Sequence, residues 1–265
     1  MKLLIRVLLL VSFASFAGPN ALADLTDGLV AHYTFDGNAN DATGNGHNGT
    51  VYGGAGYSAG ISGSAIDLDG IDDYVRVADA TDLRMEDNFS ATAWVNPASL
   101  EQMVILNKAG GIGNPNSHAV NYAMYLDAGD AGAHFENPSD ADWTIRSSGG
   151  VTSNTWQHVA FTKEGDSFTL YLNGTLADSA SYSFTEASGT YDLSIGVFLY
   201  GNYGAGLVEF FEGQIDEVRI YDRALSSGEV GQLAVPEPAT AVSLIVGSFI
   251  VVCYRRIGKV YGLMR

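Results

Sequence analysis

FTLYLNGT, residues 168–175, is the stretch of this 265-residue chain that decides the fold class. Its apolar side chains alternate with Thr and Tyr, and a period of two is typical of a half-buried β-strand. The pair Asn173-Gly174 then precedes a second run. Asn-Gly is the strongest short signal for a β-hairpin, because both residues tolerate the positive φ of a type I′ turn. The stretch therefore predicts two antiparallel strands joined by a two-residue turn.

Short runs of the same kind recur between turn residues along residues 24–224, where no long segment shows helical periodicity. This pattern is typical of an all-β sandwich of antiparallel strands. One short helix is predicted after the strands, because Ser226 and Glu229 form a capping box and Pro236 limits the helix to about Leu233. Strands are predicted at residues 29–35, 65–68, 74–77, 89–95, 122–126, 158–162, 168–172, 193–197 and 215–221.

The N-terminus has the layout of a signal peptide. Lys2 and Arg6 precede an apolar stretch, and Ala21-Leu22-Ala23 is a small-residue cleavage signal. The apolar stretch is too short to span a bilayer, which needs about 20 residues. Residues 1–23 are therefore predicted to be a signal peptide that is removed on export.

The exported part of the chain is strongly acidic and has no disulfide. Residues 24–235 contain seven Lys or Arg and 29 Asp or Glu, so their net charge is 7 − 29 = −22. Such a charge repels nucleic acid and anionic lipid, and neither is expected as a partner. The one cysteine, Cys253, lies outside this segment, so the domain must be stabilised by its core or by a bound cation.

A second apolar segment lies near the C-terminus. Residues 239–254 are long enough for a helix of about 24 Å, and Arg255, Arg256 and Lys259 follow them. The basic residues predict that this end stays cytoplasmic while the domain lies outside the inner membrane. The preceding VPEP motif, residues 235–238, completes a tail that resembles PEP-CTERM sorting signals. The resemblance implies processing by an exosortase, transient membrane anchoring and transfer to the cell surface or matrix. A permanent single-pass anchor is the alternative.

Four stretches of the chain carry a family resemblance: GLVAHYTFDG (28–37) with DATGNGHNGT (41–50), AIDLDGIDDYV (65–75), WQHVA (156–160) with LYLNG (170–174), and GQIDEVRIY (213–221) with RALS (223–226). Together they resemble the LamG-like jelly-roll family of the concanavalin A-like lectin/glucanase superfamily. The resemblance implies two antiparallel sheets packed face to face over residues 24–234, with the first and last strands adjacent. The family includes binding modules and enzymes, so the fold alone does not settle the function.

The loop after Phe35 is the candidate calcium site. It carries Asp36, Asn38, Asp41 and Asn45, and Ca²⁺ prefers such hard oxygen ligands. The family resemblance implies a structural calcium ion that joins this loop to the last strand, where the partner is Asp216. Alternation predicts that Asp216 shares a strand face with Val218 and Ile220. The alternative is an ordinary loop whose side chains bond their own backbone. The acidic cluster Asp67, Asp69, Asp72 and Asp73 is a second possible cation site, or a set of turn caps.

The sequence lacks a recognisable catalytic motif. The E-x-D-x-x-E arrangement of glycoside hydrolases on this type of sandwich is absent, as are H-E-x-x-H and G-x-S-x-G. Asp216 and Glu217 are consecutive on one predicted strand, so alternation places them on opposite faces. His158 is expected to be structural, within a core strand. The chain is therefore predicted not to be an enzyme.

Aromatic side chains near polar loops are the candidate ligand-binding residues. They are Trp143, Tyr200, Tyr203 and Phe135, since sugars stack on such rings. The alternative is that these rings complete the edge of the core. The sequence favours an exported, calcium-stabilised recognition or adhesion module that binds a polysaccharide or surface glycan. A carbohydrate-active enzyme with an unrecognised site and a purely structural matrix protein remain the alternatives.

Overall fold

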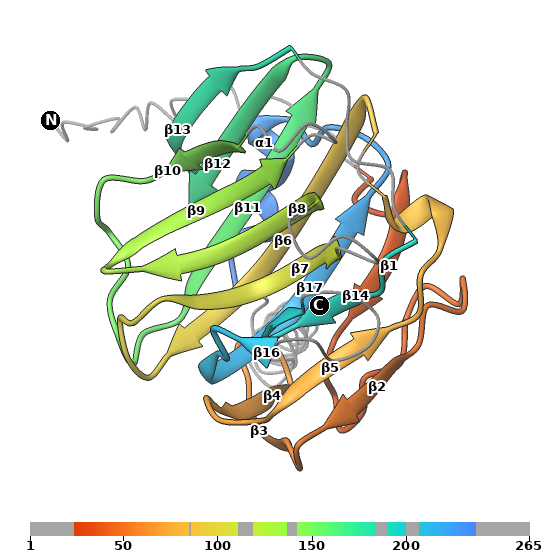
Figure 1. Ribbon diagram of the computed structural model, residues 1–265, viewed down its shortest axis with the longest axis vertical. Helices are drawn as coiled ribbons and strands as arrows, with labels where there is room; N and C mark the ends of the chain where they lie inside the picture. Colours follow the sequence, from red (N-terminus) through yellow and green to blue (C-terminus); the bar gives the residue numbers. More distant parts are fainter. Residues whose placement is uncertain are drawn as a thin grey trace, which may run out of the picture.

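The computed structural model describes residues 24–84, 86–110, 119–136, 142–183, 190–199 and 207–236. These residues form two antiparallel sheets packed face to face, as the sequence predicts. In Figure 1 strands β7 to β10 of one sheet lie in front of β6, β11 and β17 of the other. The protein is an all-β sandwich, and its helices are a single 3₁₀ turn, Thr81–Leu83, and α1, Ser227–Leu233, within the described residues.

The eight-stranded sheet is built around β17, Glu212–Tyr221. One side of β17 pairs with β6, and the other side pairs with β1 and with β4. The first and last strands of the sandwich are therefore adjacent, as the family resemblance implies. The other strands of this sheet are β1 (Leu29–Tyr33), β3 (Gly56–Ala59), β4 (Ser64–Asp69), β6 (Asn88–Pro97), β11 (Gln157–Glu164), β12 (Ser167–Leu172) and β13 (Thr175–Ser181).

The seven-stranded sheet has the order β10-β9-β8-β7-β14-β5-β2. Its strands are β2 (Gly49–Tyr52), β5 (Tyr74–Val77), β7 (Met103–Gly110), β8 (Ala119–Asp127), β9 (Asp130–Glu136), β10 (Asp142–Arg146) and β14 (Leu193–Ile195). A separate two-stranded ribbon of β15 (Phe198–Leu199) and β16 (Leu207–Val208) follows β14 in the chain. The core lies between the two large sheets and is filled by alternate residues of their strands.

The hairpin and the helix form as predicted. Asn173 and Gly174 have φ angles of 51° and 74°, which fit a type I′ turn between β12 and β13. Ser226 caps α1 by accepting a hydrogen bond from the backbone of Glu229, whose carboxylate accepts from the backbone of Ser226. The helix ends at Leu233, and its apolar side packs on Tyr221 at the outer face of the eight-stranded sheet.

The alternation predicted for β17 is wrong at its centre. Glu217 has a φ of 52°, and the register with β6 shifts between Asp216 and Arg219, which identifies a β-bulge. Val218 points into the core, whereas Asp216 and Glu217 both lie on the outer side of the strand. Asp216 therefore does not share a face with Val218, and the two carboxylates are not on opposite faces.

The predicted signal peptide, residues 1–23, and the predicted apolar helix, residues 239–254, lie outside the described residues. In the part of the chain that the structure describes, no helix is long and apolar enough to cross a membrane.

Glu229 is expected to make folding sensitive to acid. The hydrogen bond from Arg223, 2.6 Å from Nη2 to Oε1, lowers the pKa of Glu229 from its ordinary 4.5 to about 2. A depressed folded-state pKa means that the ionised group adds stability above pH 4.5, and this stability is lost as the pH falls through 2.

Glu229→Gln should lower the free energy of unfolding at pH 7 by on the order of 2 kcal/mol, and the difference should vanish near pH 2. Urea unfolding at several pH values tests this, with Glu164→Gln at the exposed last residue of β11 as the control. A constant difference between Glu229→Gln and the parent at all pH values would contradict it.

Candidate functional site

A groove with a volume of about 380 Å³ lies on the outer face of the seven-stranded sheet. Alternation along the strands explains which residues line it. On β8 the side chains of Tyr122, Met124 and Leu126 fill the core, so Ala123, Tyr125 and Asp127 face the groove. On β9 and β10 the outward residues are His134, Glu136 and Arg146. Gln102 and Val104 at β7, Phe198 of β15 and Glu209 beyond β16 complete the lining.

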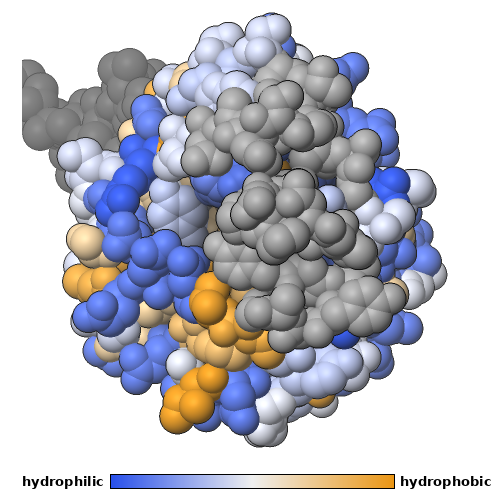
Figure 2. Space-filling model, viewed as in Figure 1, coloured by the Kyte–Doolittle hydropathy of each residue, from blue (hydrophilic) through white to orange (hydrophobic). Residues whose placement is uncertain are grey.

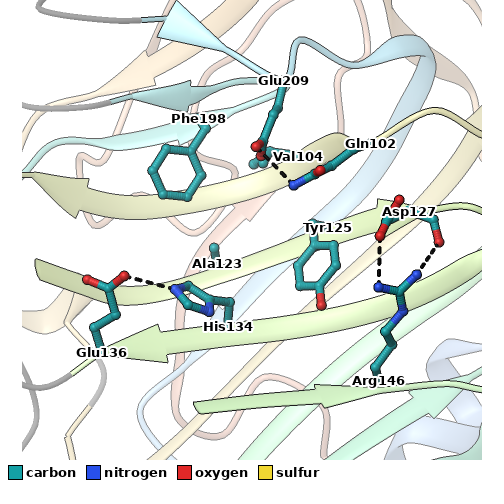
Figure 3. Close-up of a pocket in the computed structure, with 10 residues that line it drawn as sticks. All are labelled: Gln102, Val104, Ala123, Tyr125, Asp127, His134, Glu136, Arg146, Phe198 and Glu209. Atoms are coloured by element: carbon teal, nitrogen blue, oxygen red, sulfur yellow. Dashed lines mark hydrogen bonds and ion pairs between the residues drawn. The ribbon is translucent and has the colours of Figure 1, made fainter. Parts of the chain in front are cut away.

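Tyr125 lies in the middle of the groove (Figure 3). It is paired with Gly132 on β9, and a Cβ added at Gly132 would overlap the tyrosine ring. The missing side chain of Gly132 therefore lets the ring lie across the neighbouring strand. Burial raises the pKa of Tyr125, so its hydroxyl is neutral and can both donate and accept a hydrogen bond.

One end of the groove is formed by an arginine held between two aspartates. Arg146 Nη1 lies 2.7 Å from Asp127 Oδ2, and its Nε lies 2.6 Å from Asp130 Oδ2. Its Nη2 donates to the carbonyl of Asp127 at 2.9 Å. The guanidinium is therefore fixed in place and its charge is balanced by two carboxylates.

Next along the wall is a histidine–glutamate pair. His134 Nε2 lies 3.1 Å from Glu136 Oε1, and its other ring nitrogen lies 3.3 Å from the hydroxyl of Thr144. The second carboxylate oxygen of Glu136 accepts a hydrogen bond from the backbone of Val120 at 3.3 Å. These contacts orient both side chains along the strand, so the groove offers polar groups in fixed positions.

Glu209 stands on the opposite side of the groove from His134 (Figure 3). Its backbone has a φ of 56°, and Val104 donates a backbone hydrogen bond to its carbonyl at 3.0 Å. Gln102 Nε2 donates to its carboxylate at 2.9 Å. Burial raises the pKa of Glu209. The strained backbone and the amide together hold a carboxylate at the rim, beside the ring of Phe198.

The aromatic residues predicted to bind ligand lie elsewhere. Phe135 is completely buried, and its ring stacks on Phe168 with centroids 4.2 Å apart, so the prediction of an accessible ring is wrong for this residue. Trp143 is partly buried and packs against Phe135 and Tyr182 at the edge of the core. Tyr200 and Tyr203 lie outside the described residues.

Two of the predicted calcium ligands meet at one turn. Asp216 Oδ2 accepts hydrogen bonds from the backbones of Ile61 and Ser62 at 3.0 and 3.1 Å. Asp36 Oδ1 accepts from the backbone of Ser64 at 2.8 Å. The carboxylates therefore hold the β3–β4 turn from two sides. Asp216 is completely buried, and burial raises its pKa to about 7.

The other three predicted ligands have different partners. Asp41 accepts from the backbones of His32, Thr43 and His47. Asn45 Nδ2 donates to the carbonyl of Val30 at 2.8 Å, and Asn38 accepts from the backbone of Asn40. Among the described acidic and histidine residues, Asp36, Asp41 and Asp216 do not bring their ligand atoms into one group. The five residues thus do not form the single shell that the sequence predicts, and only Asp36 and Asp216 bond the same turn.

The acidic cluster of the β4–β5 turn serves as turn caps. Asp69 Oδ1 accepts from the backbones of Ile71 and Asp72, and Asp73 Oδ2 accepts from the backbone of Asp69. Asp69, Asp72 and Asp73 are also the one group in the described chain with ligand atoms within 4.8 Å of one another. Asp67 is exposed on β4 and lies outside this group.

His158 is a core residue, as predicted. It is completely buried beside Trp94, and burial lowers its pKa to about 3, so the ring is neutral. It lies on β11 of the eight-stranded sheet and does not line the groove.

Sequence reasoning missed the residues that line the groove. They come from segments far apart in the chain, and single charges on exposed strand faces resemble an ordinary solvated surface. One signal was present: the alternation that buries Phe135 also turns His134 and Glu136 outward.

The family model described as the concanavalin A-like lectin/glucanases superfamily matches residues 69–231 of the chain. No curated protein matches the chain. Solved structures with the same fold include the binding domain of Paraclostridial Mosquitocidal Protein 1, with 20% identity and a TM-score of 0.64. The match covers 79% of this chain and 52% of the toxin domain. The chain therefore spans about half of that domain.

A second similar structure is domain 4 of AbnA, an extracellular arabinanase of family GH43 from Geobacillus stearothermophilus, solved in complex with arabinotriose. It is 24% identical with a TM-score of 0.62, and the match covers 78% of this chain and 98% of that domain. The binding domain of botulinum neurotoxin serotype D is 16% identical with a TM-score of 0.62, over 79% of this chain and 52% of the toxin domain. These likenesses establish the fold.

Asp216 is expected to stabilise the protein without any bound cation. Asp216→Ala removes the acceptor of the Ile61, Ser62 and Glu217 backbone groups and should lower the free energy of unfolding by about 3 kcal/mol in the presence of a chelator. Chemical unfolding in EDTA measures the loss, with Asp67→Ala at an exposed position of β4 as the control. If the variant unfolded like the parent in EDTA, the carboxylate would act only through a cation.

Proposed function

Because the chain belongs to the concanavalin A-like lectin/glucanases superfamily, we propose that it is a non-catalytic recognition or adhesion module. Its ligand is a polysaccharide or surface glycan, bound in the groove of the seven-stranded sheet. The observation that carries this proposal is the groove itself. It combines the partly exposed ring of Tyr125 and the mostly buried ring of Phe198 with amide, carboxylate and guanidinium groups held in fixed positions.

The chemistry of the groove suits a sugar. Aromatic rings accept the apolar faces of sugar rings, and fixed polar groups bond their hydroxyls. A volume of about 380 Å³ is within the range of small-ligand sites. On the face shown in Figure 2, hydrophilic side chains predominate around a smaller hydrophobic patch near the bottom. A hydrated glycan is compatible with such a surface.

Known proteins of this fold support the proposal by analogy. Domain 4 of AbnA, over almost its full length, has the same fold and was solved with arabinotriose. The toxin structures are described as binding domains. The analogy favours binding over catalysis, and the specificity of this chain follows from its own groove.

The first and last described residues of the domain lie on the side opposite the groove, which suits attachment there. A second cavity, of about 230 Å³, is lined by Leu25 near the start of the domain, by Pro236 at its end and by Trp94 of β6. It lies on the outer face of the eight-stranded sheet, away from the groove. We infer that the protein is exported by its signal peptide and attached by its PEP-CTERM-like tail, with an exosortase as processing partner. An anchor behind the eight-stranded sheet would leave the groove facing outward, towards the cell surface or matrix.

We also propose that calcium stabilises the domain at the turn held by Asp36 and Asp216. Carboxylates from an early loop and from the last strand approach the same turn, whose backbone carbonyls are further oxygen donors. A cation there would offset the unfavourable burial of Asp216 and tie β17 to the start of the domain.

Removing the central ring should weaken glycan binding. Tyr125→Ala is expected to reduce retention on the preferred polysaccharide at least about ten-fold, or ~1.4 kcal/mol, because the stacking surface is lost. Gly132→Ala should have a similar effect by displacing the ring. Affinity electrophoresis of the full chain against soluble polysaccharides measures this, with Tyr57→Ala on exposed β3 as the control.

Released reducing ends are measured in the same samples. Retention without release supports a binding module. Product release that depends on Glu136 or Glu209 would establish a carbohydrate-active enzyme instead. Equal retention of the parent and Tyr125→Ala, with both folded, would remove the groove as the binding site.

Calcium should raise the melting temperature of the protein above its value in EDTA, since a cation would stabilise the Asp36–Asp216 turn. The increase should be smaller in Asp36→Asn and unchanged in Asn45→Ala, since Asn45 bonds elsewhere. Differential scanning calorimetry measures all three proteins. The same melting temperature in calcium and in EDTA would exclude the site.

A further inference from the structure

The charges that line the groove are mostly negative. Its described walls carry the carboxylates of Asp127, Glu136 and Glu209, the guanidinium of Arg146 and the imidazole of His134, which bonds Glu136. Arg146 is bound on both sides by Asp127 and Asp130, so its charge is balanced within the wall. A ligand that enters the groove therefore meets a negative potential.

Few basic residues in the surrounding sequence can offset the negative potential of the groove. Between Lys108 and Arg219 the chain contains two basic residues of the Lys or Arg type, Arg146 and Lys163. Lys163 is buried on the other sheet, where its ammonium donates to the carbonyls of Glu86 and Asp87. Lys108 is buried and bonds Asp79. An anionic glycan would find no cation other than Arg146 among these residues.

Glu209 is the carboxylate of the groove that lacks a cationic partner. In the described part of the chain its side chain accepts a hydrogen bond from Gln102 and forms no ion pair, and the basic group that acts on its charge is His134, which bonds Glu136. The half-buried position penalises its charge and raises its pKa, so an ammonium group beside it would relieve this cost. Its backbone at φ 56° keeps the carboxylate at the rim although the conformation is strained.

Two aromatic rings lie beside this carboxylate. Phe198 and Tyr125 border the same groove as Glu209, as Figure 3 shows. Aromatic faces attract cations, and the attraction increases where water is excluded. A carboxylate and aromatic faces around one cavity form an environment that suits an ammonium group on a ring with an apolar face.

We propose that the groove recognises a glycan that carries protonated amines, such as a deacetylated amino sugar, with the ammonium paired to Glu209. This specificity rests on the proposed function, that the groove binds a glycan. Glycans rich in uronic acids are excluded, because their carboxylates would face those of Glu136 and Glu209, while Arg146 of the described lining is already paired with two aspartates.

The test compares short probes that differ in one group. Trisaccharides of β-1,4-linked glucosamine, N-acetylglucosamine, glucose and glucuronic acid are titrated against the purified full chain by calorimetry. The buffer is at pH 6.5 with 0.15 M salt, which screens the long-range attraction of the acidic surface. The glucosamine trisaccharide should bind at least ten-fold more tightly than its N-acetylated form, and the glucuronic acid trisaccharide should not bind.

Two matched variants locate the selectivity. Glu209→Gln should lose the preference for the amine, so that the glucosamine and N-acetylglucosamine probes bind with equal affinity. Glu212→Gln makes the same change of charge at an exposed position on the other sheet and should keep the preference. Equal affinity for the amine and its acetylated form, or an equal loss in both variants, would overturn the proposal.

Two outcomes distinguish a failure of amine selectivity from a failure of glycan binding in the groove, which is the proposed function on which the selectivity rests. Binding that depends on Tyr125 but shows no preference for the amine would overturn only the selectivity. Binding that is the same in Tyr125→Ala and the parent would overturn the groove as a glycan site.

Discussion

The structure depends on one constraint: a strand that buries one face must alternate its side chains between core and surface. In the seven-stranded sheet this constraint separates two roles. Tyr122, Met124 and Leu126 of β8 fill the core, and the residues between them are free to serve a ligand. The core residues fix the register of every strand. The packing of the core therefore also determines where the side chains of the groove lie. Gly132 adds the one adjustment that lets the ring of Tyr125 lie across β9. A binding surface of this kind is rigid, since moving it requires that the core move too.

The β-bulge of β17 is where the alternation is broken, and the break has structural consequences. It turns Asp216 and Glu217 to the same side of the strand. Asp216 then bonds the β3–β4 turn, while Glu217 pairs with His32 of β1, 2.8 Å away. Although burial disfavours its charge, the contacts with His32 and Arg219 lower the pKa of Glu217. Two neighbouring carboxylates in opposite electrostatic environments thus tie the last strand to two early parts of the chain. A regular strand would have buried one of them in the apolar core.

Local patterns predicted the parts of the structure that local physics determines. The Asn173-Gly174 turn and the capping box at Ser226 involve neighbours in the sequence, and both form as expected. Alternation also located most strands of the core. It failed where the deciding interaction is non-local. Neither the positive φ of Glu217 nor the approach of Glu209 to Gln102 can be read from nearby residues, because each depends on a strand or loop that is distant in sequence. The prediction of Phe135 as a ligand-binding residue failed for the same reason. Aromatic character suggested a ligand site, but the pairing of β9 with its neighbours decides which face that ring occupies.

The pairing of β1 with β17 makes the two outer faces of the sandwich different. It brings Leu25 and Pro236 to one cavity on the outer face of the eight-stranded sheet, while the groove occupies the outer face of the other sheet. The domain can thus be held from one side without obstructing the other. Strong acidity serves this arrangement in two ways. It repels anionic polymers and lipids from the domain. At the groove the same negative charge favours one class of ligand. Glu209 forms no ion pair among the described residues, so a ligand with an ammonium group is preferred because it can pair with this carboxylate.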